Sequence, residues 1–280
     1  MKKLKKQSDE FYHLISMEDK SHALIEGRQQ TQIDKDKADR NICNRSKPMR
    51  TIGILGGLGP HTSSIFYLNI IDRFSATGSS FRPPVLMWSV PLDLEVERKF
   101  IKTGEGKDEY LRYLIQGAEN LQKGGADFIV IPCNTVHIHI DNLRKKIGIP
   151  ILSIVEETVK YLKANGVSKV AILATNATIE ENLYGLALEK EKILPIIPDK
   201  NAQKTVMEVI SNILANSNTN KDMEKLSTVI RKLKCSGIND MLLACTDLQI
   251  LMKQNECSAK VHDTMDILAG AAVRECSFLT

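Results

Sequence analysis

Two stretches of this chain end in a cysteine at matching places: GADFIVIPCNT (residues 125–135) and GINDMLLACTD (residues 237–247). In each, a glycine lies eight residues before the cysteine and a mostly apolar run follows it. Short apolar runs bounded by turn residues are typical of strands buried on both faces of a parallel sheet. The stretches predict two buried strands, each placing a thiol, Cys133 or Cys245, at its C-terminal end.

Short apolar runs alternate with amphipathic stretches from Thr51 onward. Strands are predicted at 51–55, 85–90, 127–132, 150–154, 169–174, 193–197 and 240–244. Helices are predicted at 61–75, 108–123, 135–147, 156–164, 179–190, 201–215, 222–235 and 263–276. Strands separated by helical stretches of about 10–15 residues indicate βαβ units and a parallel sheet.

An internal repeat divides this pattern into two. TIGILGGLGP (51–60) resembles KVAILATNAT (169–178), and in both a strand is followed by a loop of small residues and a helix. The offset between these segments is close to the offset between the two cysteines. The sequence therefore predicts two equivalent α/β lobes, lobe 1 at 50–160 and lobe 2 at 161–262, with a helix at 263–276 that can cross back to lobe 1.

Composition narrows the class of protein. The chain has 280 residues, 42% of them hydrophobic, which is ordinary for a globular protein with a substantial core. Residues 1–49 are polar and are expected to form a disordered extension; the net charge of +4 arises in the first 50 residues. The remainder carries 26 basic and 26 acidic residues, so we expect no nucleic-acid partner. No apolar run approaches the ~18 residues of a membrane helix, so we expect no membrane partner.

The six cysteines include no C-x-x-C pair, and no close Cys/His cluster is present. We therefore expect reduced thiols in the cytoplasm and no metal site. Two thiols facing one cleft could remove a proton from one face of a carbon and return one to the other.

The loop GGLGP (56–60) follows the first strand and opens a helix. Gly57 and Gly59 would let the backbone approach a ligand, and free N–H groups at a helix N-terminus favour an anion such as a carboxylate. A tight turn without a ligand is the alternative. Thr175 and Thr178, in the corresponding loop of lobe 2, are candidate donors to the same kind of group.

Polar residues follow each cysteine. Asn134 and Thr135 could cap the next helix or bind substrate, and His137 could act as a base, lower the pKa of the Cys133 thiol, or only pack. Thr246 is a further candidate donor. Asp247 could orient or deprotonate Cys245, or cap the next helix.

Five ordered segments resemble the aspartate/glutamate racemase family: GGLGP (56–60), PCNTVH (132–137), ATNAT (174–178), ACTD (244–247) and Asp263-Thr264 through Ala269. The resemblance implies two pseudo-symmetric Rossmann-like lobes with parallel sheets, the active site in the cleft between them, and no pyridoxal phosphate or other cofactor. It implies that Cys133 and Cys245 are the catalytic acid/base thiols, that the substrate is a small molecule, the amino acid aspartate or glutamate, and that the chain forms a homodimer.

Recognition of a second carboxylate is the open point. Members selective for aspartate carry an arginine whose counterpart here is Arg98, with a shift of two residues, and a lysine where this chain has Leu186. Two alternatives remain: an isomerase or decarboxylase of a dicarboxylate that uses one thiol, and a non-catalytic protein that binds an amino acid.

Overall fold

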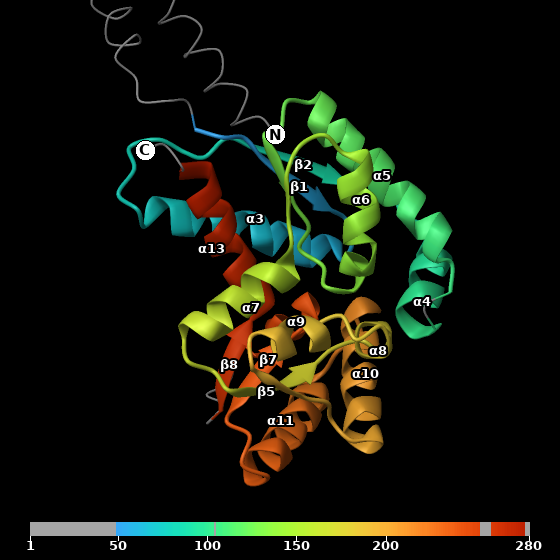
Figure 1. Ribbon diagram of the computed structural model, residues 1–280. Coiled ribbons are helices and arrows are strands. Elements are labelled where there is room, and N and C mark those ends of the chain that lie inside the picture. The colour runs from blue at the N-terminus through green and yellow to red at the C-terminus, as the bar shows by residue number, and fades with distance from the viewer. Residues whose placement is uncertain (1–48, 104, 253–258, 278–280) are drawn as a thin grey trace, which may run out of the picture. The chain divides into compact units, whose positions relative to one another are not determined.

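The computed structural model in Figure 1 describes residues 49–103, 105–252 and 259–277. They belong to one compact unit that begins at Met49. The predicted disordered extension lies, except for Met49, outside the described residues.

A parallel four-stranded sheet in the order β2-β1-β3-β4 forms what we call lobe 1. Its strands are β1 (Ile52–Gly56), β2 (Val85–Ser89), β3 (Phe128–Val130) and β4 (Ile151–Leu152). The helices in this part of the chain are α3 (Pro60–Ser75), α4 (Leu94–Thr103), α5 (Lys107–Lys123), the 3-10 helix η1 (Thr135–His139), α6 (Ile140–Lys146) and α7 (Ile154–Ala164).

A second parallel sheet, in the order β6-β5-β7-β8, forms lobe 2. Its strands are β5 (Lys169–Leu173), β6 (Leu194–Ile196), β7 (Asp240–Leu243) and β8 (Lys260–Asp263). Its helices are α8 (Asn176–Glu180), α9 (Gly185–Lys190), α10 (Lys200–Leu214), α11 (Asn220–Cys235), the 3-10 helix η2 (Thr246–Leu248) and α12 (Gln249–Met252), and α13 (Thr264–Ser277) follows. Corresponding strands occupy corresponding positions in the two sheets, which confirms the predicted pair of α/β lobes.

Alternate strand residues serve different cores, because successive side chains of a strand point to opposite faces. In β3, Phe128 and Val130 join an apolar cluster shared by both lobes, whereas Ile129 joins a cluster confined to lobe 1. In β7, Leu242 joins the shared cluster and Leu243 a cluster confined to lobe 2. The shared cluster also takes residues of α3, α7, α9 and α13, so it connects the two lobes.

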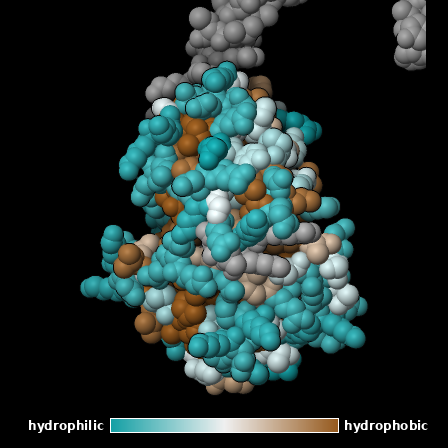
Figure 2. All heavy atoms as spheres, turned by 90° about the vertical axis from the view of Figure 1, so that its right-hand side faces the viewer, coloured by the Kyte–Doolittle hydropathy of each residue, from teal (hydrophilic) through white to brown (hydrophobic). Residues whose placement is uncertain are grey.

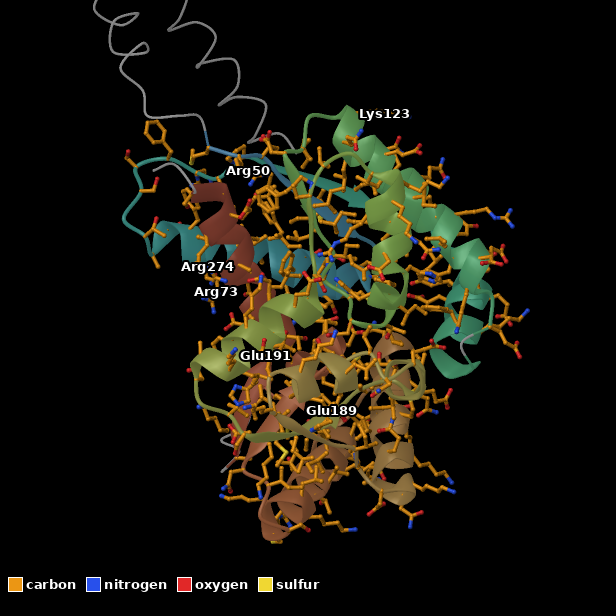
Figure 3. All side chains as sticks on the ribbon, viewed as in Figure 1. Arg50, Arg73, Lys123, Glu189, Glu191 and Arg274 are labelled. Atoms are coloured by element: carbon orange, nitrogen blue, oxygen red, sulfur yellow. The ribbon has the colours of Figure 1, made fainter. Side chains whose placement is uncertain are left out.

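Helix α13 leaves the end of β8 in lobe 2 and packs against α3 of lobe 1 and against α7 (Figure 1). Ion pairs add to this contact: Arg73 of α3 binds Asp266 through two hydrogen bonds, and Arg274 pairs with Glu157 of α7. Figure 3 shows Arg73 and Arg274 close together beside α13.

The boundaries expected from the sequence for the two lobes, 50–160 and 161–262, stay a prediction.

Local structure differs from the sequence-based expectation at several places. Strand β8 and helix α4 were not predicted, and the predicted helix at 135–147 is a 3-10 turn followed by α6. The predicted helix at 179–190 is two short helices, α8 and α9. Between them Asn182 has a φ of 49°, a left-handed conformation that ends a right-handed helix.

The described surface is mostly hydrophilic on the face drawn in Figure 2, where hydrophobic side chains lie in separate areas. Among the described helices, none is long and apolar enough to cross a membrane.

Gly57 gives a test of the turn after β1. Its φ is +85°, and a Cβ there would lie 2.5 Å from the backbone N of Val90. Gly57→Ala should lower the free energy of unfolding by about 3 kcal/mol or more, because both strain and overlap must be relieved. The measurement is urea denaturation followed by circular dichroism.

Gly78 supplies the matched control, because its φ is +76° and a Cβ would meet nothing within 4 Å. Gly78→Ala should cost about 1–2 kcal/mol, the strain alone. Equal losses of unfolding free energy in the two variants would show that overlap with the Val90 backbone adds no cost beyond the backbone strain.

Candidate active site

Cys133 and Cys245, which follow β3 and β7, line one cavity. Its volume is about 20 Å³, room for roughly one water molecule. The lining residues come from both lobes: Leu58, Glu97, Phe100, Tyr110, Cys133, Asn134, Thr135, Val136, Thr175, Ile210, Leu214, Cys245, Thr246 and Asp247. The structure thus brings both predicted thiols to the same enclosed space.

Each thiol has the same local backbone arrangement. Cys133 precedes η1, and the N–H groups of Thr135 and Val136 are directed at its sulfur. Cys245 precedes η2, and the N–H groups of Asp247 and Leu248 are directed at its sulfur. In both cases the donors are two and three residues after the cysteine, so the start of a 3-10 helix stabilises either thiolate.

Burial opposes that stabilisation at Cys133. Loss of solvent, and to a smaller extent the negative charges of Asp247 and Glu97, raise the pKa of the Cys133 thiol to about 12. The N–H groups of Val136 and Thr135 only partly offset these effects. The Cys133 thiol is therefore protonated at neutral pH in the structure as it stands.

Cys245 is in the same protonation state. Burial raises the pKa of its thiol well above the ordinary value, and the charge of Asp247 raises it further. The Cys245 Sγ lies 3.9 Å from Asp247 Oδ2, within reach of a weak hydrogen bond that the thiol donates. The hydroxyl of Thr62, in α3 of lobe 1, donates to the other oxygen of Asp247. Asp247 therefore holds Cys245 as a thiol and links the lobes.

Three predicted substrate residues form a buried cluster of hydroxyls. Thr135 Oγ1 lies 3.0 Å from Thr175 Oγ1 and 3.1 Å from Thr178 Oγ1, and the last two are 3.0 Å apart. Thr175 also accepts a hydrogen bond from the N–H of Thr178 and caps α8. The cluster joins the loop after β3 to the loop after β5.

Asn134 and Thr246 also cross between the lobes. The Asn134 amide donates to Thr264 Oγ1 at 3.0 Å and accepts from the hydroxyl of Tyr184. Its side chain makes no capping hydrogen bond to η1, in contrast to one sequence-based interpretation. Thr246 Oγ1 donates to Pro132 O at 3.2 Å, next to Cys133.

His137 contacts the backbone with both ring nitrogens. Its Nε2 lies 3.1 Å from the N–H of Ile154 and accepts from it, so Nδ1 carries the proton and donates to Cys133 O at 2.8 Å. Burial lowers the pKa of His137 to about 4. A neutral ring with both nitrogens engaged neither takes a proton from Cys133 nor offers it a positive charge. The interpretation of His137 as a base or cation is therefore wrong; the ring orients the backbone of Cys133.

The glycine loop contributes less to the cavity than the sequence suggested. Gly57 donates its N–H to Ser63 Oγ at 3.0 Å, and the backbone of Val90 fills the space of its missing side chain. These contacts account for Gly57 as part of a tight turn, the alternative to a ligand-binding loop. Gly59 lies beside Asp247, to which a Cβ would come within 3.2 Å.

Arg98 lies on α4, but its side chain is outside what the structure describes. Its contact with a substrate stays a prediction.

The fold agrees with the comparisons with known proteins. Residues 55–272 match the Asp/Glu/hydantoin racemase family. The broad specificity amino-acid racemase RacX from Bacillus subtilis (strain 168) is 28% identical over 226 residues, which span 79% of this chain and 96% of that protein. This chain belongs to the Asp/Glu/hydantoin racemase family.

Solved structures of similar proteins have the same fold. An aspartate racemase homologue from Pyrococcus horikoshii OT3 superposes with a TM-score of 0.68 and 26% identity, covering 82% of this chain and 100% of that one. The aspartate racemase of Picrophilus torridus superposes with a TM-score of 0.69 and 24% identity, covering 81% of this chain and 94% of that one. These structures confirm the Rossmann-like lobes, and the family match together with the similarity to RacX supports the predicted activity, amino-acid racemisation.

Several cavity residues of this racemase were not predicted. Glu97 and Phe100 come from α4, Tyr110 from α5, and Ile210 and Leu214 from α10. None of them stands in a recognisable motif, and they reach the thiols only through tertiary packing.

The described residues include no group of three or more His, Cys, Asp or Glu arranged to hold a metal ion.

His137 gives a pH test of this geometry. Its pKa is lowered from 6.5 to about 4, so the unfolded chain binds a proton between these values and the folded protein does not. Stability should fall by about 3 kcal/mol as the pH falls from 6.5 to 4, at 1.36 kcal/mol per unit of pKa shift. The measurement is urea unfolding at a series of pH values.

His137→Gln should remove this part of the pH dependence, whatever it does to absolute stability. His61→Gln, at an exposed histidine, should keep it. A pH dependence that is the same in wild type and in His137→Gln would contradict the buried neutral ring.

Proposed function

We propose that this protein racemises a free α-amino acid with Cys133 and Cys245 as the two acid/base groups. The observation that carries the proposal is that both thiols, one from each lobe, line one cavity with matching pairs of backbone N–H donors. A thiolate takes the α-proton from one face, and the opposite thiol gives its proton to the other face. The enzyme then holds the thiolate on the other side and is ready for the reverse reaction.

Charge developing on the substrate α-carboxylate must be stabilised, because the α-proton is a very weak acid. Asn134, Thr135, Thr175 and Thr246 line the cavity and are the candidate donors. Thr178 supports them through the hydroxyl cluster. These side chains already bond across the lobes, so a substrate carboxylate would exchange with some of those bonds.

Substrate binding supplies a reason for a thiolate to form. Both thiols are protonated in the structure because of burial and nearby carboxylates. The α-ammonium of an amino acid brings a positive charge into the same enclosed space and favours the thiolate. In this account the bound substrate itself activates its base.

The cavity must open for this reaction. A volume of about 20 Å³ does not hold an amino acid, and α4 packs against α8 across the lobes. Separation of the lobes, or movement of α4, would admit the substrate, and closure would exclude water.

Other expectations from the sequence stay predictions: aspartate or glutamate as substrate, a mechanism without pyridoxal phosphate, a homodimer and a cytoplasmic location. The two alternatives, a one-thiol isomerase or decarboxylase and a non-catalytic binding protein, are separated by the cysteine variants. A one-thiol enzyme loses activity with one variant only, and a binding protein shows no turnover.

Cys133→Ala and Cys245→Ala should each lower kcat for racemisation by a factor of about 10³ or more, because each removes the proton donor or acceptor on one face. The measurement is chiral chromatography of each enantiomer after incubation with enzyme. Cys235→Ala, at an exposed thiol on α11, should keep wild-type activity. Full racemisation by either cavity variant would refute the two-thiol mechanism.

The pH dependence of kcat/KM provides a second test. The pKa of the Cys133 thiol is raised to about 12, so the thiolate fraction of the free enzyme rises about tenfold per pH unit through neutral pH. The log of kcat/KM should therefore rise with a slope near one between about pH 6.5 and 8.5. A plateau across that range would show that a thiolate is already present before substrate binds.

A further inference from the structure

A chain of buried hydrogen bonds runs from Tyr184 to the strand that precedes Cys245. The hydroxyl of Tyr184, at the start of α9, donates to Asn134 Oδ1. Asn134 Nδ2 donates to Thr264 Oγ1 at 3.0 Å, and Thr264 Oγ1 donates to Leu243 O at 2.8 Å. Leu243 is the last residue of β7. The chain therefore joins the loop after β3, in lobe 1, to the end of β7, in lobe 2.

The direction of every bond in this chain is fixed by one backbone carbonyl. Leu243 O can only accept, so the proton between it and Thr264 Oγ1 belongs to the hydroxyl. The Thr264 oxygen must then accept from Asn134, which places the NH2 group of the amide on that side. The amide oxygen is left for Tyr184, whose hydroxyl must donate. The Asn134 amide thus has only one orientation that satisfies the chain.

This orientation leaves one N–H of Asn134 for the cavity. Nδ2 carries two N–H groups, and the chain uses one of them. Within the part of the chain that the structure describes, no hydrogen bond occupies the second, and Asn134 lines the cavity together with both thiols. A substrate carboxylate could accept from this N–H without breaking the chain. The hydroxyls of Thr135 and Thr175, in contrast, are already bonded to each other.

We propose that Tyr184 and Thr264 are positioning residues of the two-thiol site, which hold the Asn134 amide so that its second N–H is presented to the substrate carboxylate. Neither is among the residues that line the cavity, so each acts through Asn134. All three side chains are at most 2% exposed, so water does not replace a lost partner. The inference rests on the proposed function, since it assigns two further residues to the same site.

The test uses two variants that each remove one hydroxyl, Thr264→Val and Tyr184→Phe. The substrate is the amino acid that wild type racemises fastest among the proteinogenic ones. Values of kcat and KM are measured by chiral chromatography, and folding is checked by circular dichroism. Thr228→Val is the matched control for threonine, because its hydroxyl also donates to a backbone carbonyl, that of Glu224, on α11. Tyr161→Phe, at a partly exposed tyrosine of α7, is the control for tyrosine.

Each variant should lower kcat by about 10-fold or more and change KM by less than about threefold, because charge on the carboxylate grows in the transition state. Thr264→Ser, which keeps the hydroxyl, should restore kcat to within about threefold of wild type. The double variant should lose at most about threefold beyond the more impaired single variant, since both changes act through one amide. The two controls should keep the kcat of wild type.

The outcomes distinguish this inference from the proposed function. If either folded variant keeps kcat within about threefold of wild type, or if the two losses multiply in the double variant, the residues do not act through Asn134, and the two-thiol proposal stands. If Thr264→Val does not fold, Tyr184→Phe, which removes a single oxygen atom, decides by the same criterion on kcat. If wild type racemises no proteinogenic amino acid, the proposed function itself fails and the inference falls with it.

Discussion

The site depends on a set of buried polar contacts that join the loops of two separate sheets. Cys133 follows a strand of lobe 1 and Cys245 a strand of lobe 2, so no local interaction can bring them together. Asn134 bonds to Tyr184 and Thr264, Thr135 to Thr175 and Thr178, Thr246 to the carbonyl of Pro132, and Thr62 to Asp247. A buried polar group without a partner is costly, so these contacts favour the one arrangement of the lobes that satisfies them all.

This arrangement explains why much of the fold could be predicted and part of the site could not. β1, β3, β5 and β7 were predictable because their apolar runs between turn residues are local signals, and the cysteines follow directly from them. The three threonines of the hydroxyl cluster were predicted as substrate residues, but their contact with one another was not. These contacts form only where the two lobes meet, so no local sequence signal marks them. Glu97 was missed for the same reason, and β8 because its sequence KVHD has no apolar run.

His137 shows how a motif can mislead about a role. Its position four residues after Cys133 suggested a partner for the thiol, but on the short 3-10 turn the ring contacts two backbone groups instead. The structure thereby assigns the control of the thiol pKa to other groups. Burial and two carboxylates hold the thiols protonated, and backbone N–H groups oppose this from the start of each 3-10 helix.

The proposed two-thiol mechanism needs one thiolate, and burial and the nearby carboxylates disfavour it in the structure. The balance must therefore change when substrate binds, which makes the positive charge of the amino acid part of the catalytic arrangement. A closed cavity strengthens this effect, because electrostatic interactions are larger where water is excluded. The small volume and the raised pKa values are in this view two consequences of the same closure.

Racemisation of a single enantiomer in D2O tests the central claim, that the two thiols act on opposite faces, most directly. At low conversion the product and the remaining substrate are separated, and the deuterium at each α-carbon is measured by mass spectrometry. The account predicts that the product carries one deuterium while the remaining substrate keeps its protium, because a different group protonates each face. Equal deuterium in product and remaining substrate at early times would contradict the account, since it would show that one group serves both faces.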